Sequence, residues 1–334
     1  MQDSLSQRLP DPVRIEAAMG TIDPRFLDSP LVQNAVLDER MDCSVLTKIE
    51  TLNPIRSFKG RGTDLVLSSL LAAEATSDRA RPVVVSASAG NFGQGLAFAG
   101  VSRGVDVIVY TAENANPLKI EAMRRFGARV VQEGQDFDAA KAAARAYAAQ
   151  HGWPFIEDGA VAEVAEGAGT IALELTKAKA RFDTILLPLG NGALVTGVGA
   201  WLRVERPDCR VIGVVAEAAP AMLLSWQKRS AVETSAAATM ADGIAVRVPV
   251  PYALACMATT VDDVVSVSET ALLAAMRLAH ETLGLVVEPA GAAGLAALVA
   301  QPERFRGRAV ATILCGGNLT VAQMRQWLCA DPAL

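Results

Sequence analysis

The chain has 334 residues, of which 51% are hydrophobic, 20% charged and 5% aromatic. A chain of this length and composition can bury a large core in one or two domains, which excludes disordered and fibrous proteins. The formal net charge of -5 at pH 7 supplies no basic surface for a phosphate backbone, so nucleic acid is not an expected partner.

The five cysteines are far apart and form no C-x-x-C pair. This pattern indicates neither a disulfide framework nor a zinc site, and it favours a reducing cytoplasm. The N-terminus lacks the basic and apolar regions of a signal peptide, so nothing indicates export. Two uncharged stretches, 83–102 and 184–202, approach the length of a membrane span. Both contain glycine-rich turns and are interpreted as strand, turn and helix, so no membrane partner is expected.

In chain order, the first strand-like segment is S-V-L-T-K-I-E-T, and the N-P-I-R-S-F-K-G-R-G segment that follows places Lys59 near a helix start. From about residue 80, short β-branched runs alternate with alanine-rich stretches, which is typical of βα units on a parallel sheet. The runs are apolar throughout, as expected of strands buried on both faces. The predicted strands are 82–87, 105–110, 128–131, 183–189, 210–216 and 308–315. The predicted helices are 92–103, 116–126, 136–150, 161–180, 192–205, 268–283 and 319–328.

The predicted fold class is α/β, with two interwoven domains built on mostly parallel sheets. No internal repeat, low-complexity linker or block of like charge separates the domains along the chain. Turn-rich sequence at 79–82 and 151–154 marks two crossings between them. We therefore expect a large domain formed by 1–78 and 156–334, and a small mobile domain formed by 79–155.

Four glycine-containing turns follow predicted strands or lie near them, at Ser88–Gly93, Gly190–Leu194, Asp242–Ile244 and Cys315–Asn318. Parallel α/β sheets bind ligands at the carboxyl ends of their strands. Each turn alone is usually structural, because glycine is the simplest way to turn a chain. Their joint occurrence with Lys59, which alone would be an ordinary surface lysine, predicts one ligand site.

Five motifs together resemble the fold-type II family of pyridoxal 5'-phosphate enzymes. They are S-F-K-G-R-G, S-A-G-N, D-G-I-A-V, E-P-A-G-A and C-G-G-N. The resemblance is to the serine/threonine dehydratase (threonine ammonia-lyase) branch, and it runs from Ser29 to Asn318. It implies a fold like that of the tryptophan synthase β subunit, and a homodimer. It also implies β-elimination of water from a 3-hydroxy amino acid, such as L-threonine or L-serine, giving a 2-oxo acid and ammonia.

The resemblance makes Lys59 the residue that holds the cofactor through a reversible carbon–nitrogen bond, which requires an amine. Phe58 is expected to pack against the pyridine ring. The cofactor phosphate is assigned to the backbone N–H groups of the turn Gly190, Asn191, Gly192, Ala193 and Leu194. Most dehydratases have four consecutive glycines here, so Gly-Asn-Gly-Ala departs from the family pattern.

Further roles are carried over from the family to the other motifs. Asn91 matches the residue that hydrogen-bonds the ring hydroxyl. Cys315 takes the position that faces the pyridine nitrogen, where an uncharged thiol favours elimination. The remaining assignments are Gly243 and Glu288 beside the cofactor, and the turn Ser88, Ala89, Gly90, Asn91 and Phe92 around the substrate carboxylate. Phe92 replaces the commoner histidine, so a bulkier or acidic 3-hydroxy amino acid remains open as the substrate.

A serine racemase-like activity is the first alternative, because racemases share most of these motifs. Racemisation needs a second acid or base on the face opposite the lysine. Racemases of the family have a serine at the position of Ala89, and alanine cannot move a proton. Dehydration is therefore favoured over racemisation.

Other functions explain fewer of the residues. A dinucleotide-binding fingerprint is imitated by Gly190, Gly192 and Gly197, with Glu217 after the next strand. An NAD-dependent oxidoreductase would, however, leave Lys59 unexplained. A non-catalytic binding protein on an enzyme fold remains open, although the complete set of site residues argues against it. The two histidines at 151 and 280 lack hydrolase motifs.

Two absences are expected as well. Racemase-like members of the family bind a divalent cation through a glutamate and a nearby aspartate at the position of Glu217; residues 218–224 contain no second carboxylate, so no such site is expected here. The chain ends shortly after C-G-G-N, so we expect no C-terminal amino-acid-sensing domain and no feedback by isoleucine.

Overall fold

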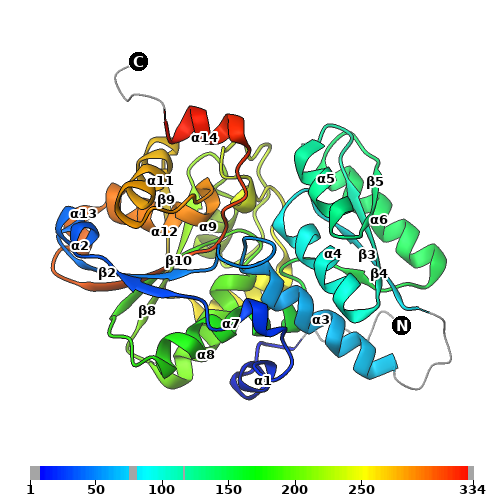
Figure 1. Ribbon diagram of the computed structural model, residues 1–334, viewed down its shortest axis with the longest axis horizontal. Coiled ribbons are helices and arrows are strands. Elements are labelled where there is room, and N and C mark those ends of the chain that lie inside the picture. Colours follow the sequence, from blue (N-terminus) through cyan, green and yellow to red (C-terminus); the bar gives the residue numbers. More distant parts are fainter. Residues whose placement is uncertain (1–7, 75–80, 116, 330–334) are drawn as a thin grey trace.

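The computed structural model describes residues 8–74, 81–115 and 117–329. Two sheets lie side by side, each between layers of helices (Figure 1). The larger sheet has the order β1-β2-β10-β7-β8-β9, and only β1 runs antiparallel to its neighbour. Its strands are β1 (Leu31–Gln33), β2 (Ser44–Ile49), β7 (Thr184–Pro188), β8 (Arg210–Ala216), β9 (Asp263–Val267) and β10 (Ala309–Leu314).

The smaller sheet has four parallel strands in the order β5-β4-β3-β6. They are β3 (Val83–Ala87), β4 (Asp106–Thr111), β5 (Arg129–Gln132) and β6 (Phe155–Ile156). Alternate side chains of its strands face opposite helical layers, as the period of a strand requires. Val84 and Val109 pack toward α4 (Asn91–Arg103) and α5 (Pro117–Arg125), whereas Val85 and Ile108 pack toward α6 (Phe137–His151).

The larger sheet is also covered on both faces. One layer contains α7 (Ala162–Lys177), α8 (Ala193–Glu205), α9 (Ala221–Lys228) and α10 (Pro251–Thr260), together with α1 (Pro12–Ala18). The other contains α2 (Ala35–Met41), α11 (Glu269–Leu283), α12 (Pro289–Ala300), α13 (Pro302–Phe305) and α14 (Val321–Trp327). The remaining elements are α3 (Lys59–Glu74) and the short helices η2 (Pro24–Phe26) and η3 (Asp242–Ile244). Within the described residues, none of the helices has the length and apolar character needed to cross a membrane.

The strands and helices predicted after residue 80 are confirmed, with ends displaced by at most three residues. The α/β class with mostly parallel sheets is confirmed as well. The prediction missed the short strands β1, β6 and β9, and it missed several helices. The missed helices are α1, α2, α9, α10, α12 and α13.

Helix α7 packs backbone to backbone against two other helices, α3 and α8. A Cβ atom added to Gly167 would lie 2.6 Å from the Cα of Gly62 on α3. A Cβ atom added to Gly197 on α8 would lie 1.8 Å from the carbonyl oxygen of Ala165. Since α3 begins at Lys59 and α8 begins directly after Gly192, α7 fixes the starts of both helices relative to each other.

Candidate active site

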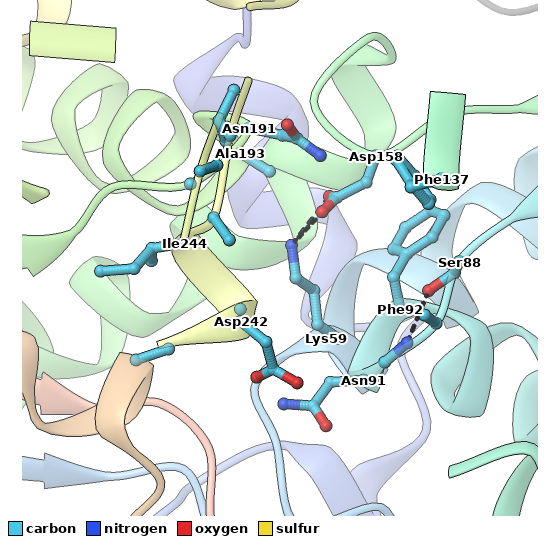
Figure 2. Close-up of a pocket in the computed structure, with 18 of the residues that line it drawn as sticks. Lys59, Ser88, Asn91, Phe92, Phe137, Asp158, Asn191, Ala193, Asp242 and Ile244 are labelled. Atoms are coloured by element: carbon cyan, nitrogen blue, oxygen red, sulfur yellow. Dashed lines mark hydrogen bonds and ion pairs between the residues drawn. The ribbon is translucent and has the colours of Figure 1, made fainter. Parts of the chain in front are cut away.

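The turns after β3, β6, β7 and β10 line one cavity of about 420 Å³ (Figure 2). The carboxyl ends of strands from both sheets therefore converge on one space, as parallel α/β architecture predicts. Every residue that the sequence assigned to the site lies on its wall. These residues are Phe58, Lys59, Ser88, Ala89, Gly90, Asn91, Phe92, Gly190, Asn191, Gly192, Ala193, Leu194, Gly243, Glu288 and Cys315.

Lys59 is the first residue of α3, and hydrogen bonds to the end of β10 fix its backbone. The N–H of Phe58 and the hydroxyl of Ser57 both donate to the carbonyl of Cys315, each at 3.1 Å. The Lys59 ammonium reaches into the cavity, where it contacts both carboxylate oxygens of Asp158 at 2.6 and 2.8 Å. The site thus presents a primary amine at the meeting point of the two sheets.

Arg61, two residues further along α3, lies in a sealed cluster of charges behind the cavity. Its guanidinium is fully buried and donates to Glu50 at 2.8 Å and to Glu174 at 2.5 Å. Lys48 contacts Glu174 at 2.6 Å, so two cations and two anions balance. Burial alone would raise the pKa of Glu174, but the hydrogen bond and charge of Arg61, together with Lys48, hold it below its usual range. This cluster ties α3 to β2 and α7.

The 88–92 turn opens the N-terminus of α4 toward the cavity. The Ser88 hydroxyl accepts hydrogen bonds from the N–H groups of Gly90 at 3.2 Å and Gly93 at 3.0 Å. Gly90 is the N-cap and supplies no side-chain cap, and no acidic residue lies in the first turn. A helix N-terminus of this kind favours an anion.

Asn91 is held by two residues that fix which way its amide faces. Its Nδ2 donates to Glu288 at 2.7 Å, and its Oδ1 accepts from Asn318 Nδ2 at 2.9 Å. Glu288 also accepts from the Asn318 backbone N–H at 3.1 Å. Burial raises the pKa of Glu288, although Lys119 and these hydrogen bonds oppose the rise. The sequence marks Asn318 only as part of a glycine-rich turn, so its contact with Asn91 is a finding of the structure.

The 190–194 turn shows why Gly-Asn-Gly-Ala can replace four glycines. Gly192 takes a left-handed conformation, with φ of +94°, and a Cβ atom on Gly190 would lie 2.7 Å from the carbonyl oxygen of Gly243. Neither Asn191 nor Ala193 is among the described residues with positive φ. Glycine is therefore kept where the backbone requires it, and α8 begins at Ala193 without a side-chain cap.

Cys315 directly follows β10, and its thiol is buried in the cavity wall. Its Sγ lies 4.0 Å from the carbonyl oxygen of Ala290. Burial raises the pKa of this thiol well above its usual range, and the Glu288 carboxylate adds to the rise. The group that faces the cavity from β10 is consequently uncharged.

Several charged residues of the cavity were given no role by sequence reasoning. Asp158 follows β6 by two residues, so the rule for carboxyl ends of parallel strands could have found it once that short strand was recognised. Lys119, on α5, forms an ion pair with Asp242 of η3. Arg247 forms another with Asp138 at the start of α6. These two pairs join elements packed on different sheets, a relationship that local sequence does not reveal.

The dinucleotide-binding and hydrolase interpretations find little support in the geometry. Glu217 is exposed and does not line the cavity. His151 stacks on Trp153, with ring centroids 4.5 Å apart, and its Nδ1 lies 2.9 Å from the carbonyl oxygen of Tyr147. His280 lies exposed on α11.

The donor set fits pyridoxal phosphate. It combines an amine that can bond an aldehyde, an uncapped helix N-terminus for a phosphate, and an uncharged group at Cys315. The family model described as "Pyridoxal-phosphate dependent enzyme" matches residues 22–316, and the chain belongs to this family.

Two curated relatives illustrate where the chain lies within the family. The biosynthetic L-threonine dehydratase of Salmonella typhimurium is 31% identical over 300 residues, which cover 89% of this chain and 57% of that protein. The L-threonine ammonia-lyase of Geobacter sulfurreducens is 33% identical over 307 residues, which cover 92% of this chain and 75% of that protein. The chain thus spans little more than half the length of the Salmonella enzyme.

Solved structures show the same fold. A threonine deaminase from T.th. superimposes with a TM-score of 0.85 at 30% identity, covering 93% of this chain and 99% of that one. A pyridoxal 5'-phosphate-dependent aspartate racemase superimposes with a TM-score of 0.87 at 26% identity, covering 96% of this chain and 99% of that one. The fold is therefore shared by lyases and racemases, and the distinction between them depends on the site.

Proposed function

We propose that this protein is an ammonia-lyase that eliminates water from a 3-hydroxy amino acid, L-threonine, L-serine or a related analogue. The observation that carries the proposal is the convergence of all the assigned residues on one cavity around the Lys59 amine. The names of the curated relatives support the same reaction. The products are a 2-oxo acid and ammonia.

The chain's own residues would hold the cofactor at three points. Lys59 would bond its aldehyde carbon, and the N–H groups of the 190–194 turn would bind its phosphate. Asn91, held by Glu288 and Asn318, would donate its remaining amide N–H to the ring hydroxyl. When bound, pyridoxal phosphate withdraws electrons from the Cα of an attached amino acid. Phe58 and Cys315, which line the same cavity, would border the ring without adding charge.

Lys59 is also the proposed base. The substrate amine would first displace Lys59 from the cofactor, so that the freed Lys59 amine can remove the Cα proton while the β-hydroxyl departs with a proton as water. The resulting enamine then takes up water and releases ammonia, so L-serine yields pyruvate and L-threonine yields 2-oxobutanoate. The N-terminus of α4, which begins at Asn91, would bind the carboxylate throughout.

The test is an assay of the purified, cofactor-loaded protein against a panel of 3-hydroxy amino acids in both enantiomers. Ammonia and 2-oxo acid released in equal amounts from an L-substrate support the proposal. Chiral analysis of L-serine reactions tests the racemase alternative, because Ala89 offers no proton on the second face. D-serine formed as fast as pyruvate would contradict the lyase assignment.

We propose a homodimer, a cytoplasmic location and a small domain, 79–155, that moves relative to the large one. Sedimentation velocity tests the dimer, and cell fractionation tests the location. Hydrogen exchange with and without substrate tests the motion, since protection should change around the cavity turns.

A further inference from the structure

The charges around the cavity raise the question of what neutralises a bound carboxylate. Within the described chain, four cationic and six acidic side chains line the wall. The cationic residues are Lys59, Lys119, Lys141 and Arg247, and the acidic residues are Asp136, Asp138, Glu157, Asp158, Asp242 and Glu288. A carboxylate loses hydration when it enters such a space, so it needs a dedicated cation.

Three of the cations are already committed. Lys59 is paired with Asp158 and is the proposed reacting amine. Lys141 lies 3.3 Å from Glu157 and 3.8 Å from a carboxylate oxygen of Asp138. Arg247 is paired with the other oxygen of Asp138.

Lys119 differs because it is far less exposed than its partner. Its side chain is 13% exposed, whereas that of Asp242 is 58% exposed. Burial lowers the pKa of Lys119, and the Glu288 carboxylate opposes this change. An exposed carboxylate regains its hydration on leaving an ion pair, so it contributes little to holding the pair together. Asp242 is thus a partner that another anion can replace.

Lys119 also lies in the right part of the cavity. Asp242, its partner, lies on the Asn91 side of Lys59, away from Asn191 in the phosphate turn (Figure 2). Lys119 lines the same cavity as Glu288, whose carboxylate accepts a hydrogen bond from the Asn91 amide. The Lys119 side chain and the N-terminus of α4 therefore line the same cavity, and both favour a carboxylate.

We propose that Lys119 binds a carboxylate of the amino-acid substrate, in exchange for Asp242. This inference rests on the proposed function and adds to it a specificity-determining residue. The chemistry recognised is a carboxylate, which is the α-carboxylate in every amino acid and an additional side-chain carboxylate in an acidic one.

The experiment uses cofactor-loaded protein and follows substrate binding by the change in cofactor absorbance. Lys119→Met should raise the Kd for substrate by at least about 30-fold, because one partner of a buried charge pair is removed. The absorbance spectrum before substrate and the melting temperature should stay as in the wild type. Lys141→Met is the matched control, since it removes another cavity lysine, and its Kd should change by less than about 3-fold.

Two substrates identify which carboxylate is bound. An effect of Lys119→Met on L-serine assigns Lys119 to the α-carboxylate. An effect confined to L-threo-3-hydroxyaspartate assigns it to a side-chain carboxylate. Unchanged Kd values for both substrates would overturn the proposal. A wild-type protein that shows no absorbance change and no 2-oxo acid with any substrate would instead contradict the proposed function.

Asp242→Asn tests the exchange itself. Removing the competing carboxylate should leave Lys119 available and lower the Kd for L-serine by a few-fold. Lys119→Met combined with Asp242→Asn should bind as weakly as Lys119→Met alone, because without the Lys119 ammonium Asp242 and the substrate carboxylate have nothing to compete for. An Asp242→Asn protein that binds L-serine as weakly as Lys119→Met would overturn the exchange.

Discussion

Lys59 and Arg61 lie two residues apart in the first turn of α3, yet the two cations differ in burial and in the number of their ion-pair partners. Arg61 is fully buried between Glu50 and Glu174, and the cluster contains as many anions as cations. Lys59 faces a cavity with one carboxylate partner, Asp158, and keeps 15% of its side chain exposed. One turn of helix therefore carries a charge that is locked in place and a charge that can change partners.

The difference separates stability from reactivity. Removing one member of a fully paired buried cluster leaves a charge without compensation, so such a cluster holds its backbone firmly. A cation with a single partner at the edge of a cavity can exchange that partner for a ligand. We expect substitutions in the sealed cluster to affect unfolding, and substitutions in the cavity to affect turnover.

The largest effect is expected for Lys59→Ala. Loss of the amine removes both the bond to the cofactor and the proposed base, so kcat should fall by at least about 10³-fold. The melting temperature should stay within a few degrees of the wild type, because Asp158 remains in contact with solvent. Borohydride reduction followed by mass spectrometry measures the covalent adduct. An adduct of full yield in Lys59→Ala would place the cofactor on another residue.

Arg61→Met should produce the converse result, a large loss of stability. It leaves Glu50 and Glu174 with too few positive partners, and the free energy of unfolding should fall by about 3–5 kcal/mol. Arg203→Met is the matched control. Its partner Asp262 is partly exposed, so the loss there should be at most about 1 kcal/mol. Urea unfolding measures both, and equal losses would contradict the distinction between sealed and exposed pairs.

Glu288→Gln sharpens the comparison because Glu288 belongs to the cavity but is as buried as the sealed cluster. Both of its oxygens accept hydrogen bonds, from Asn91 and from the Asn318 N–H. A glutamine must direct its amide N–H₂ toward one of these donors, which should cost about 1–3 kcal/mol at pH 5.

The loss in Glu288→Gln should shrink as the pH rises. Burial raises the pKa of Glu288, so the folded protein holds this proton more tightly than the unfolded chain does. The stability contributed by the group is complete below the usual glutamate pKa and is lost as the pH rises through the raised value. Urea unfolding at several pH values measures the difference from the wild type, and a difference that grows with pH would mean that the pKa of Glu288 is lowered by folding instead.

The smallest effect is expected for Cys315→Ser. Burial raises the pKa of the thiol, so the wild type presents an uncharged group and serine replaces it with another. Turnover should change by less than about 3-fold.

Iodoacetamide should label the exposed Cys329 and leave Cys315 unmodified in the folded protein. Rapid labelling of Cys315, read by peptide mass spectrometry, would show that its thiol is more accessible than the structure indicates.

The elements that sequence predicted best are those with a strong local pattern. Strands such as β7 and β8 are apolar runs bounded by turns, so their periodicity and ends are visible without tertiary information. Helix α12 was missed because it is apolar on every side and therefore has no amphipathic period. Strand β6 was missed because it has only two residues and depends entirely on its pairing with β3.

The candidate site divides in the same way. Motif residues such as Lys59, Asn91 and Cys315 are recognisable because each occupies a turn with its own local pattern. Lys119 and Asp242 are not, because their ion pair joins α5 to η3 across more than a hundred residues of chain. Burial of that lysine is a property of the assembled cavity, which no local window contains.

The contacts of α7 also limit how this protein can be engineered. Replacing glycine by alanine inside a helix is a common way to gain stability, because it reduces the freedom of the unfolded chain. At Gly167 and Gly197 the same change would force neighbouring backbones apart, since each added methyl group would overlap them. The spacing between Lys59 and the 190–194 turn thus depends on two glycines that leave no room for a methyl group. Thermostabilising libraries should leave both positions untouched.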